Sequence, residues 1–241
     1  GAILNVINRE GNTEKVTGSA NLSLISSKAL LEGPIPKWKG IKGSWMISGR
    51  RTYIDKVVDA LALPSGSKNS DGSDIPLRFP YYFYDYQIKA NLDIDQDHRL
   101  TFTRFYGDDV LDFSYEDPSE TVSNENVTIQ QDSKFGLDWP WGNQTNGLTW
   151  RWIVSPKMIT KTFLSNSRYR FDFDLFFQNR DLYTYSDSTV INFINFNWNI
   201  YDIIKDRTLE TEVQYKYSND HELTGGFQIK KIRFDLGIQY D

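Results

Sequence analysis

Hydrophobic and polar residues alternate along most of this chain with the two-residue period of a β-strand. The segment 85–107, DYQIKANLDIDQDHRLTFTRFYG, alternates on both sides of the polar stretch DQDHR. This pattern predicts a long hairpin with a tight turn near Gln96. Each of its strands would have one apolar face and one polar face, and the question is whether the apolar face meets a protein core or lipid.

The same alternation returns in segments 43–53, 148–154, 209–217 and 231–240. It is clearest from Ser167 to Phe177, where one face is almost wholly aromatic and the other carries arginine and aspartate. The sequence therefore predicts an all-β, antiparallel fold. VVDALAL, at residues 57–63, is the one stretch compatible with a short helix.

Short turns are predicted near Lys37, Gln96, Pro156 and Asp220, at separations of 59, 60 and 64 residues. Between them we expect long polar loops, at about residues 56–80, 108–142 and 178–188, with the strand boundaries in 178–208 left open. Short and long connections would then alternate, as in an outer-membrane barrel with short periplasmic turns and long extracellular loops. A soluble β-sandwich with ordinary half-buried strands is the alternative.

Charged side chains on the polar faces favour the barrel, because they would be costly in a dry core but not in a watery lumen. The predicted lumen-lining residues are Gln87, Lys89, Asn91, Arg170, Asp172, Asp174, Glu210, Glu212, Arg233 and Asp235. The aromatic run 81–84 fits an interfacial girdle.

Composition narrows the possible functions. The net charge of -5 and the pI near 5.2 argue against a nucleic-acid partner, because no basic stripe is available to replace phosphate counterions. The chain has no cysteine, which excludes a disulfide scaffold and a thiolate metal site. No signal peptide opens the sequence, and no apolar run approaches the length of a membrane helix. A mean hydropathy of -0.53 is compatible with barrel strands.

Candidate chemistry is sparse, and we predict no catalytic residue, metal ligand or cofactor. Asp93 to Asp97 has the spacing of a calcium loop, but His98 and Arg104 stand where that loop needs glycine and a carboxylate. The only other histidine, His221, also lies in a predicted turn. Paired carboxylates such as Asp172 and Asp174 are better explained as lumen residues than as catalysts.

Three aromatic residues in the predicted loop 108–142 are candidate ligand contacts. Trp139, Trp141 and Tyr115 lie in a polar stretch that would be extracellular, where their rings could stack on a sugar or organic ligand. Interfacial anchoring is an equal alternative for the two tryptophans.

The order of several motifs resembles TonB-dependent outer-membrane receptors of the kind common in Bacteroidetes. GAILNVINREGN is similar to the end of a plug domain, and SLISSKALLEGPI followed by GSWMISGRRTYID is similar to a first barrel hairpin. FPYYFYDYQIKANLDI before DHRLTFTRFYGDD continues the likeness. It covers residues 1–111 in good order and the remainder more loosely.

This resemblance implies a fragment, with residues 1–13 as the C-terminal end of the plug and 14–241 as the N-terminal part of a transmembrane β-barrel. About 8 of about 22 strands would be present. The implied partners are outer-membrane lipid, the rest of the barrel and plug, a small-molecule ligand, and the TonB complex through a missing N-terminal part. The implied function is uptake of a scarce ligand, such as a siderophore, oligosaccharide or peptide, at the bacterial outer membrane. A complete eight-stranded adhesive or structural barrel and a soluble β-sandwich binding domain remain the alternatives.

Overall fold

The computed structural model describes residues 9–36, 40–61, 64–68, 74–76 and 78–241, with residues 64–68, 75–76 and 115–120 described as backbone only. Nine strands form one antiparallel sheet in the order β1-β2-β3-β6-β7-β8-β9-β10-β11, so neighbours in sequence are neighbours in space except across α1, β4 and β5. The strands are β1 Thr17–Leu22, β2 Ser26–Pro34, β3 Lys42–Thr52, β6 Tyr81–Asp93, β7 His98–Ser123, β8 Val127–Ser155, β9 Met158–Tyr185, β10 Thr189–Lys216 and β11 Glu222–Tyr240. The predicted all-β, antiparallel fold is confirmed.

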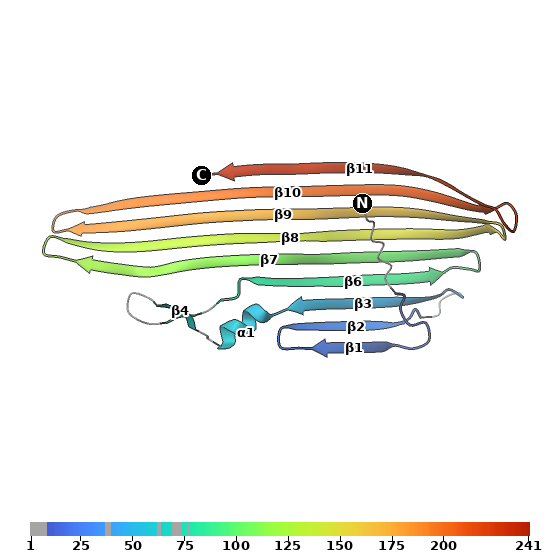
Figure 1. The fold of residues 1–241 in the computed structure, drawn as a ribbon, viewed down its shortest axis with the longest axis horizontal. Helices are drawn as coiled ribbons and strands as arrows, with labels where there is room; N and C mark the ends of the chain where they lie inside the picture. The colour runs from blue at the N-terminus through green and yellow to red at the C-terminus, as the bar shows by residue number, and fades with distance from the viewer. Residues whose placement is uncertain (1–8, 37–39, 62–63, 69–73, 77) are drawn as a thin grey trace.

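Short connections join the long strands at both ends of the sheet (Figure 1). At one end, here called the turn end, the predicted turns near Gln96, Pro156 and Asp220 are confirmed. At the opposite, distal end, β7 joins β8 through residues 124–126, and β9 joins β10 through residues 186–188. Position 37 of the remaining predicted turn lies outside the described residues, as do residues 1–8 of the segment that resembles the end of a plug.

The long loops predicted at residues 108–142 and 178–188 are wrong. Apart from the turns at residues 124–126 and 186–188, both segments belong to the distal parts of β7, β8 and β9, and their backbones pair almost to the hairpin tips. The strands are 26 to 29 residues long in β7 to β10. Asp, Asn and Ser normally mark irregular chain, but here cross-strand hydrogen bonds on both sides of each strand override that local preference.

The segment between β3 and β6 is only partly the irregular loop that its composition predicts. It contains the helix α1 Ile54–Leu61 and the small hairpin of β4 Pro64–Lys68 and β5 Asp74–Pro76. The compatible helix at VVDALAL is thus confirmed up to Leu61. None of the described helical residues forms a helix long and apolar enough to cross a membrane.

The sheet lacks a conventional core. Within the described part of the chain, Met46 is the only buried large apolar side chain, whereas large apolar side chains are exposed along each of the strands β7 to β11. Both faces of a single sheet must contact solvent, lipid or another part of a protein. The distribution of apolar side chains on each face indicates which of these it contacts.

Candidate functional site

Register divides the side chains of the sheet between two faces. Lys89 pairs with Thr103, Thr103 with Gly147 and Gly147 with Ser165, so these positions share one side, called the Lys89 face. The neighbouring positions, including Leu148, belong to the opposite side, called the Leu148 face. From β6 to β11 the pairing keeps one register except near strand ends, so the assignment holds across these strands.

An apolar band covers the Leu148 face at the turn end. One row of directly paired residues is Phe102, Leu148, Leu164, Leu209 and Ile229. Trp150, Trp152 and Val213 continue the band toward the turns. Trp150 is 39% exposed and Leu164 is 47% exposed, although strands flank both residues on each side. The exposure is therefore a property of the face and does not come from a free sheet edge.

The Lys89 face is mostly polar at the same end, and the N-terminal segment lies against it. Arg9 forms an ion pair with Glu32, and Glu10 accepts a hydrogen bond from Arg99 at 2.6 Å. Asn91 is almost fully buried on this face and accepts a hydrogen bond from the Thr101 hydroxyl at 2.9 Å. Two charged residues of this face, Glu32 and Arg99, therefore find their partners in the N-terminal segment that lies across the sheet.

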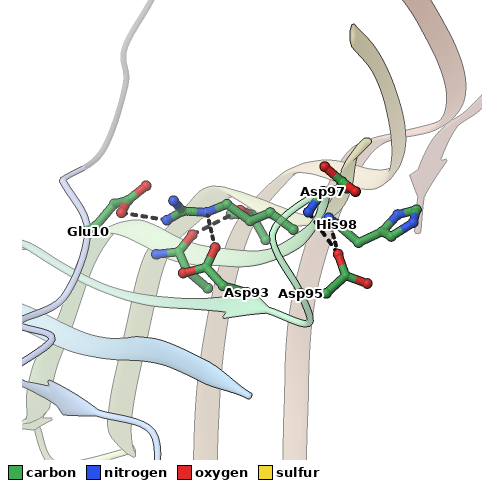
Figure 2. A network of polar contacts seen from close by, with 8 residues as sticks. Glu10, Asp93, Asp95, Asp97 and His98 are labelled. Atoms are coloured by element: carbon green, nitrogen blue, oxygen red, sulfur yellow. Dashed lines mark hydrogen bonds and ion pairs between the residues drawn. The ribbon is translucent and has the colours of Figure 1, made fainter. Parts of the chain in front are cut away.

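The turn between β6 and β7 is held by its own polar groups (Figure 2). Asp95 Oδ1 accepts hydrogen bonds from the backbone N–H groups of Asp97 and His98, at 2.8 and 2.7 Å. These bonds lower the pKa of Asp95 by stabilising its charged form. Arg99 links the turn to the N-terminal segment, since it lies 3.6 Å from Asp93 as well as contacting Glu10. The carboxylates of Asp93 and Asp95 therefore hold the turn and the neighbouring Arg99 in place.

His98 belongs to an aromatic stack at the edge of the apolar band. Its ring lies 5.7 Å from Trp150 and 5.5 Å from Trp152, and Trp150 Nε1 donates to His98 Nδ1 at 3.2 Å. Aromatic rings with a polar handle are typical of the boundary between an apolar and a watery layer.

The polarity of both faces reverses toward the distal end. On the Leu148 face, the row beyond Leu148 is Asn146, Asn166, Arg207 and Lys231, and the following row is Gln144, Arg168, Lys205 and Arg233. On the Lys89 face the polar positions give way to aromatic ones, beginning near Tyr169. Each long strand therefore carries its apolar side chains on one face in its first part and on the other face in its second.

This reversal corrects the predicted lumen-lining set, whose members do not share a surface. Gln87, Lys89, Asn91, Glu210 and Glu212 are on the Lys89 face, whereas Arg170, Asp172, Asp174, Arg233 and Asp235 are on the Leu148 face. The alternation within one strand shows which of its residues share a face. It does not show which face of the neighbouring strand continues that face, because this depends on the register between the two strands. The ten residues cannot all line one lumen.

The candidate ligand contacts Trp139 and Trp141 lie together in β8, in an aromatic cluster on the distal Lys89 face. Trp139 lies 5.5 Å from Trp141 and 5.7 Å from both Phe171 and Phe173. Trp198 and Tyr81 extend the cluster. The backbone of Tyr115 pairs with Phe135, and its side chain lies outside the described atoms. Both tryptophans occupy a regular strand, so their prediction as loop residues is wrong.

An acidic group occupies the distal Leu148 face. Asp138 pairs directly with Asp112 and Asp174, and Asp172 is nearby. Partial burial of the Asp138 carboxylate raises its pKa, and repulsion from Asp112, Asp174 and Asp172 raises it further. Asn199 relieves some of the repulsion by donating to Asp172 at 3.1 Å and to Asp174 at 2.6 Å. Among the described residues no group of carboxylates or histidines is arranged to hold a metal ion.

Asp108 connects three strands on the Leu148 face, three rows beyond the apolar row of Phe102 and Leu148. It is 5% exposed, accepts hydrogen bonds from Tyr84 at 3.1 Å and Tyr106 at 2.6 Å, and lies 3.4 Å from Arg170. Arg170 is on β9, so its guanidinium reaches across β8. The intervening residue in this row is Gly142, and a Cβ atom there would lie 1.9 Å from Asp108 Oδ1. The missing side chain leaves room for the ion pair.

Gly142→Ala is therefore expected to destabilise the sheet by about 1–3 kcal/mol, because the new methyl group meets both Asp108 and the Gly107 carbonyl oxygen. Gly225→Ala is the matched control, since a Cβ atom there meets nothing within 4 Å. Denaturant titration of the two variants compares them directly. Equal stability of the two variants would contradict the close packing at Gly142.

The sequence contains a signal for the reversal of the two faces. Apolar residues stand at even positions from Leu148 to Trp152 but at odd positions from Phe135 to Trp141. That change of phase predicts a reversal of faces only if the intervening GNQTNG is continuous strand, and its composition suggested a loop. Comparison with models of known protein families and with curated proteins found no match.

Proposed function

We propose that this chain is part of the transmembrane barrel of a TonB-dependent outer-membrane receptor, which takes up a scarce ligand into the periplasm of a bacterium. The receptor class rests on the resemblance of residues 1–111. The placement in a membrane rests on one observation from the structure, which is the exposed apolar band on the Leu148 face with polar residues directly behind it.

The apolar band suits lipid better than a protein core. A barrel strand crosses the hydrocarbon layer with about 9–11 tilted residues, apolar outside and polar inside. On β10 the Leu148 face carries Leu209, Thr211, Val213 and Tyr215, and Tyr217 follows directly after the strand, a stretch of about nine residues. Glu210 and Glu212 face the other way. In this arrangement the Leu148 face contacts lipid and the Lys89 face lines the lumen at the turn end.

The reversal of the faces supports the same placement. The strands β7 to β10 are much longer than a bilayer requires, so their distal halves would extend into the extracellular medium. There the Leu148 face meets water and can be charged. The aromatic cluster of Trp139 and Trp141 then lines the inner wall above the membrane, where a ligand descending toward the plug would pass.

The N-terminal segment supports the plug assignment. Through Arg9, Glu10 and Gly11 it lies against the face proposed to line the lumen. A chain leaving a plug inside the barrel must cross that face to reach the first barrel strand, β1. The ion pair of Glu10 with Arg99 would fix the crossing point.

Both alternatives make structural demands. A complete eight-stranded barrel requires its first and last strands to pair, and β1 and β11 are not paired with each other in the described residues. A soluble β-sandwich requires a second sheet over the apolar band, and the only other sheet in the described part of the chain is the β4–β5 hairpin. The receptor barrel meets neither difficulty.

Cysteine accessibility tests the membrane placement, since the chain has no cysteine of its own. In intact outer membranes Trp150→Cys is expected to resist a water-soluble maleimide, because its thiol would face lipid. Arg151→Cys, the adjacent position on the other face, is expected to react. Mass spectrometry of the labelled protein measures both, and urea-denatured samples provide the fully reactive reference.

Equal labelling of the two cysteines in intact membranes, or recovery of the protein in the aqueous fraction without detergent, would refute the membrane placement. The receptor class is tested separately by comparing ligand uptake in cells with and without TonB. Uptake that does not depend on TonB would leave a membrane barrel but remove the proposed coupling.

A further inference from the structure

We propose that six basic residues on the Leu148 face form a binding surface for phosphate groups of an anionic lipid in the outer leaflet. This surface, called the basic belt, consists of Arg168, Arg170, Lys205, Arg207, Lys231 and Arg233. The proposal rests on the membrane placement proposed above, because that placement puts lipid headgroups at the level of the belt.

The belt is built from directly opposed like charges. Arg168 pairs with Lys205 and Lys205 with Arg233, and in the next row Arg207 pairs with Lys231. Residues directly opposite each other in an antiparallel sheet have their Cβ atoms about 4.5–5.5 Å apart, where like charges destabilise the pair. The three neighbouring strands β9, β10 and β11 thus carry a cluster of positive charge, and a bound anion would reduce the repulsion within it.

Few carboxylates of the protein neutralise the basic residues of the belt. Arg170 is paired with Asp108, and Arg233 lies 3.7 Å from Asp235. Arg168, Lys205, Arg207 and Lys231 have no ion pair with any described residue. Lys205, Arg207 and Lys231 are exposed, so their charged groups can reach a phosphate, and an arginine guanidinium can bind phosphate oxygens with two parallel hydrogen bonds.

The position of the belt selects a lipid as the source of the phosphate. The row containing Arg207 and Lys231 follows directly after the apolar row of Leu164, Leu209 and Ile229. Two residues along a strand correspond to about 6.6 Å. A lipid whose acyl chains lie on the apolar row would therefore hold its headgroup at the belt.

The acidic group farther along the same face limits the site to this level. Asp172 follows Arg170 on β9, and Asp174, Asp138 and Asp112 lie just beyond. These carboxylates repel an anion that approaches from the distal side. The face thus passes from apolar to basic to acidic along the strands, an order that matches acyl chains, phosphates and water.

The test compares two double variants that each remove one directly opposed Arg–Lys pair. Arg207→Gln with Lys231→Gln changes the belt. Arg151→Gln with Lys161→Gln is the matched control, because these residues are also directly paired but lie on the Lys89 face. The probes are phosphorylated lipid A, dephosphorylated lipid A with the same acyl chains, and inorganic phosphate, each titrated into the detergent-solubilised full-length protein and followed by native mass spectrometry.

Phosphorylated lipid A is expected to bind the unmodified protein more tightly than the dephosphorylated form does. Because each basic residue near a membrane surface contributes a few-fold in affinity, the belt variant is expected to bind it about thirty-fold more weakly. The control variant should bind like the unmodified protein, and high salt should weaken the phosphate-dependent part.

Equal affinity for the two lipids, or an equal loss in both variants, would overturn the proposal. Competition by inorganic phosphate at the concentration of the lipid would also overturn it, because the site would then take a soluble anion. These failures differ from a failure of the membrane placement, which would appear as labelling of Trp150→Cys in intact membranes. A protected Trp150→Cys with no lipid selectivity would remove the belt proposal alone.

Discussion

Val213→Arg is expected to prevent most of the protein from reaching its folded state in the outer membrane. Val213 lies in the middle of the apolar positions of β10, on the Leu148 face. If that face meets lipid, an arginine there costs about 2–4 kcal/mol near the bilayer midplane. The measurement is the amount of folded protein in outer membranes, together with urea titration of the purified protein in lipid vesicles.

Gln214→Arg is the control for this substitution. It introduces the same charge at the next residue, but Gln214 is exposed on the Lys89 face, where lysine and glutamate already occur. Little change is expected there, because a watery lumen accepts another charge. If both variants fold equally well, the Leu148 face does not contact hydrocarbon, and the soluble alternative regains its place.

Asp108→Ala is expected to lower the free energy of unfolding by about 3 kcal/mol, the usual scale for removing one partner of a buried ion pair. Tyr84 and Tyr106 would lose their acceptor, and Arg170 would lose the only carboxylate paired with it in the described structure. Denaturant titration in lipid vesicles measures the loss. Asp108→Asn should lose less, because its amide oxygen can still accept a tyrosine hydroxyl.

Asp112→Ala controls for the removal of negative charge from the same face. Asp112 is exposed and belongs to the acidic group that repels Asp138, so its loss is expected to be neutral or slightly stabilising. A double variant of Asp108 and Arg170 completes the test. If the two single effects simply add, the ion pair across Gly142 does not exist as described.

The alternation of residues was sufficient to predict the fold class and the tight turns. Side chains of a strand must alternate between its faces, so segments such as 167–177 and 209–217 could be recognised without any knowledge of their neighbours. The turns near Gln96, Pro156 and Asp220 followed from polar residues that interrupt this alternation.

The distal halves of the strands could not be predicted in the same way. Residues 108–142 contain several aspartates, asparagines and glycines, whose local preference is for turns. Their extended conformation depends on hydrogen bonds from neighbouring strands, which are remote in sequence. The same limitation placed Trp139 and Trp141 in a loop, although they lie in the middle of the aromatic cluster.

The sequence by itself thus determined that the chain forms two-faced antiparallel strands joined by tight turns, because that information is contained in residues two apart. Only the tertiary structure decided which faces are continuous, since register depends on the pairing of separate strands. That pairing divided the predicted lumen residues between two faces and brought Asp108 to Arg170 across Gly142. It also placed the basic belt one row beyond the apolar band, a position that no single strand encodes.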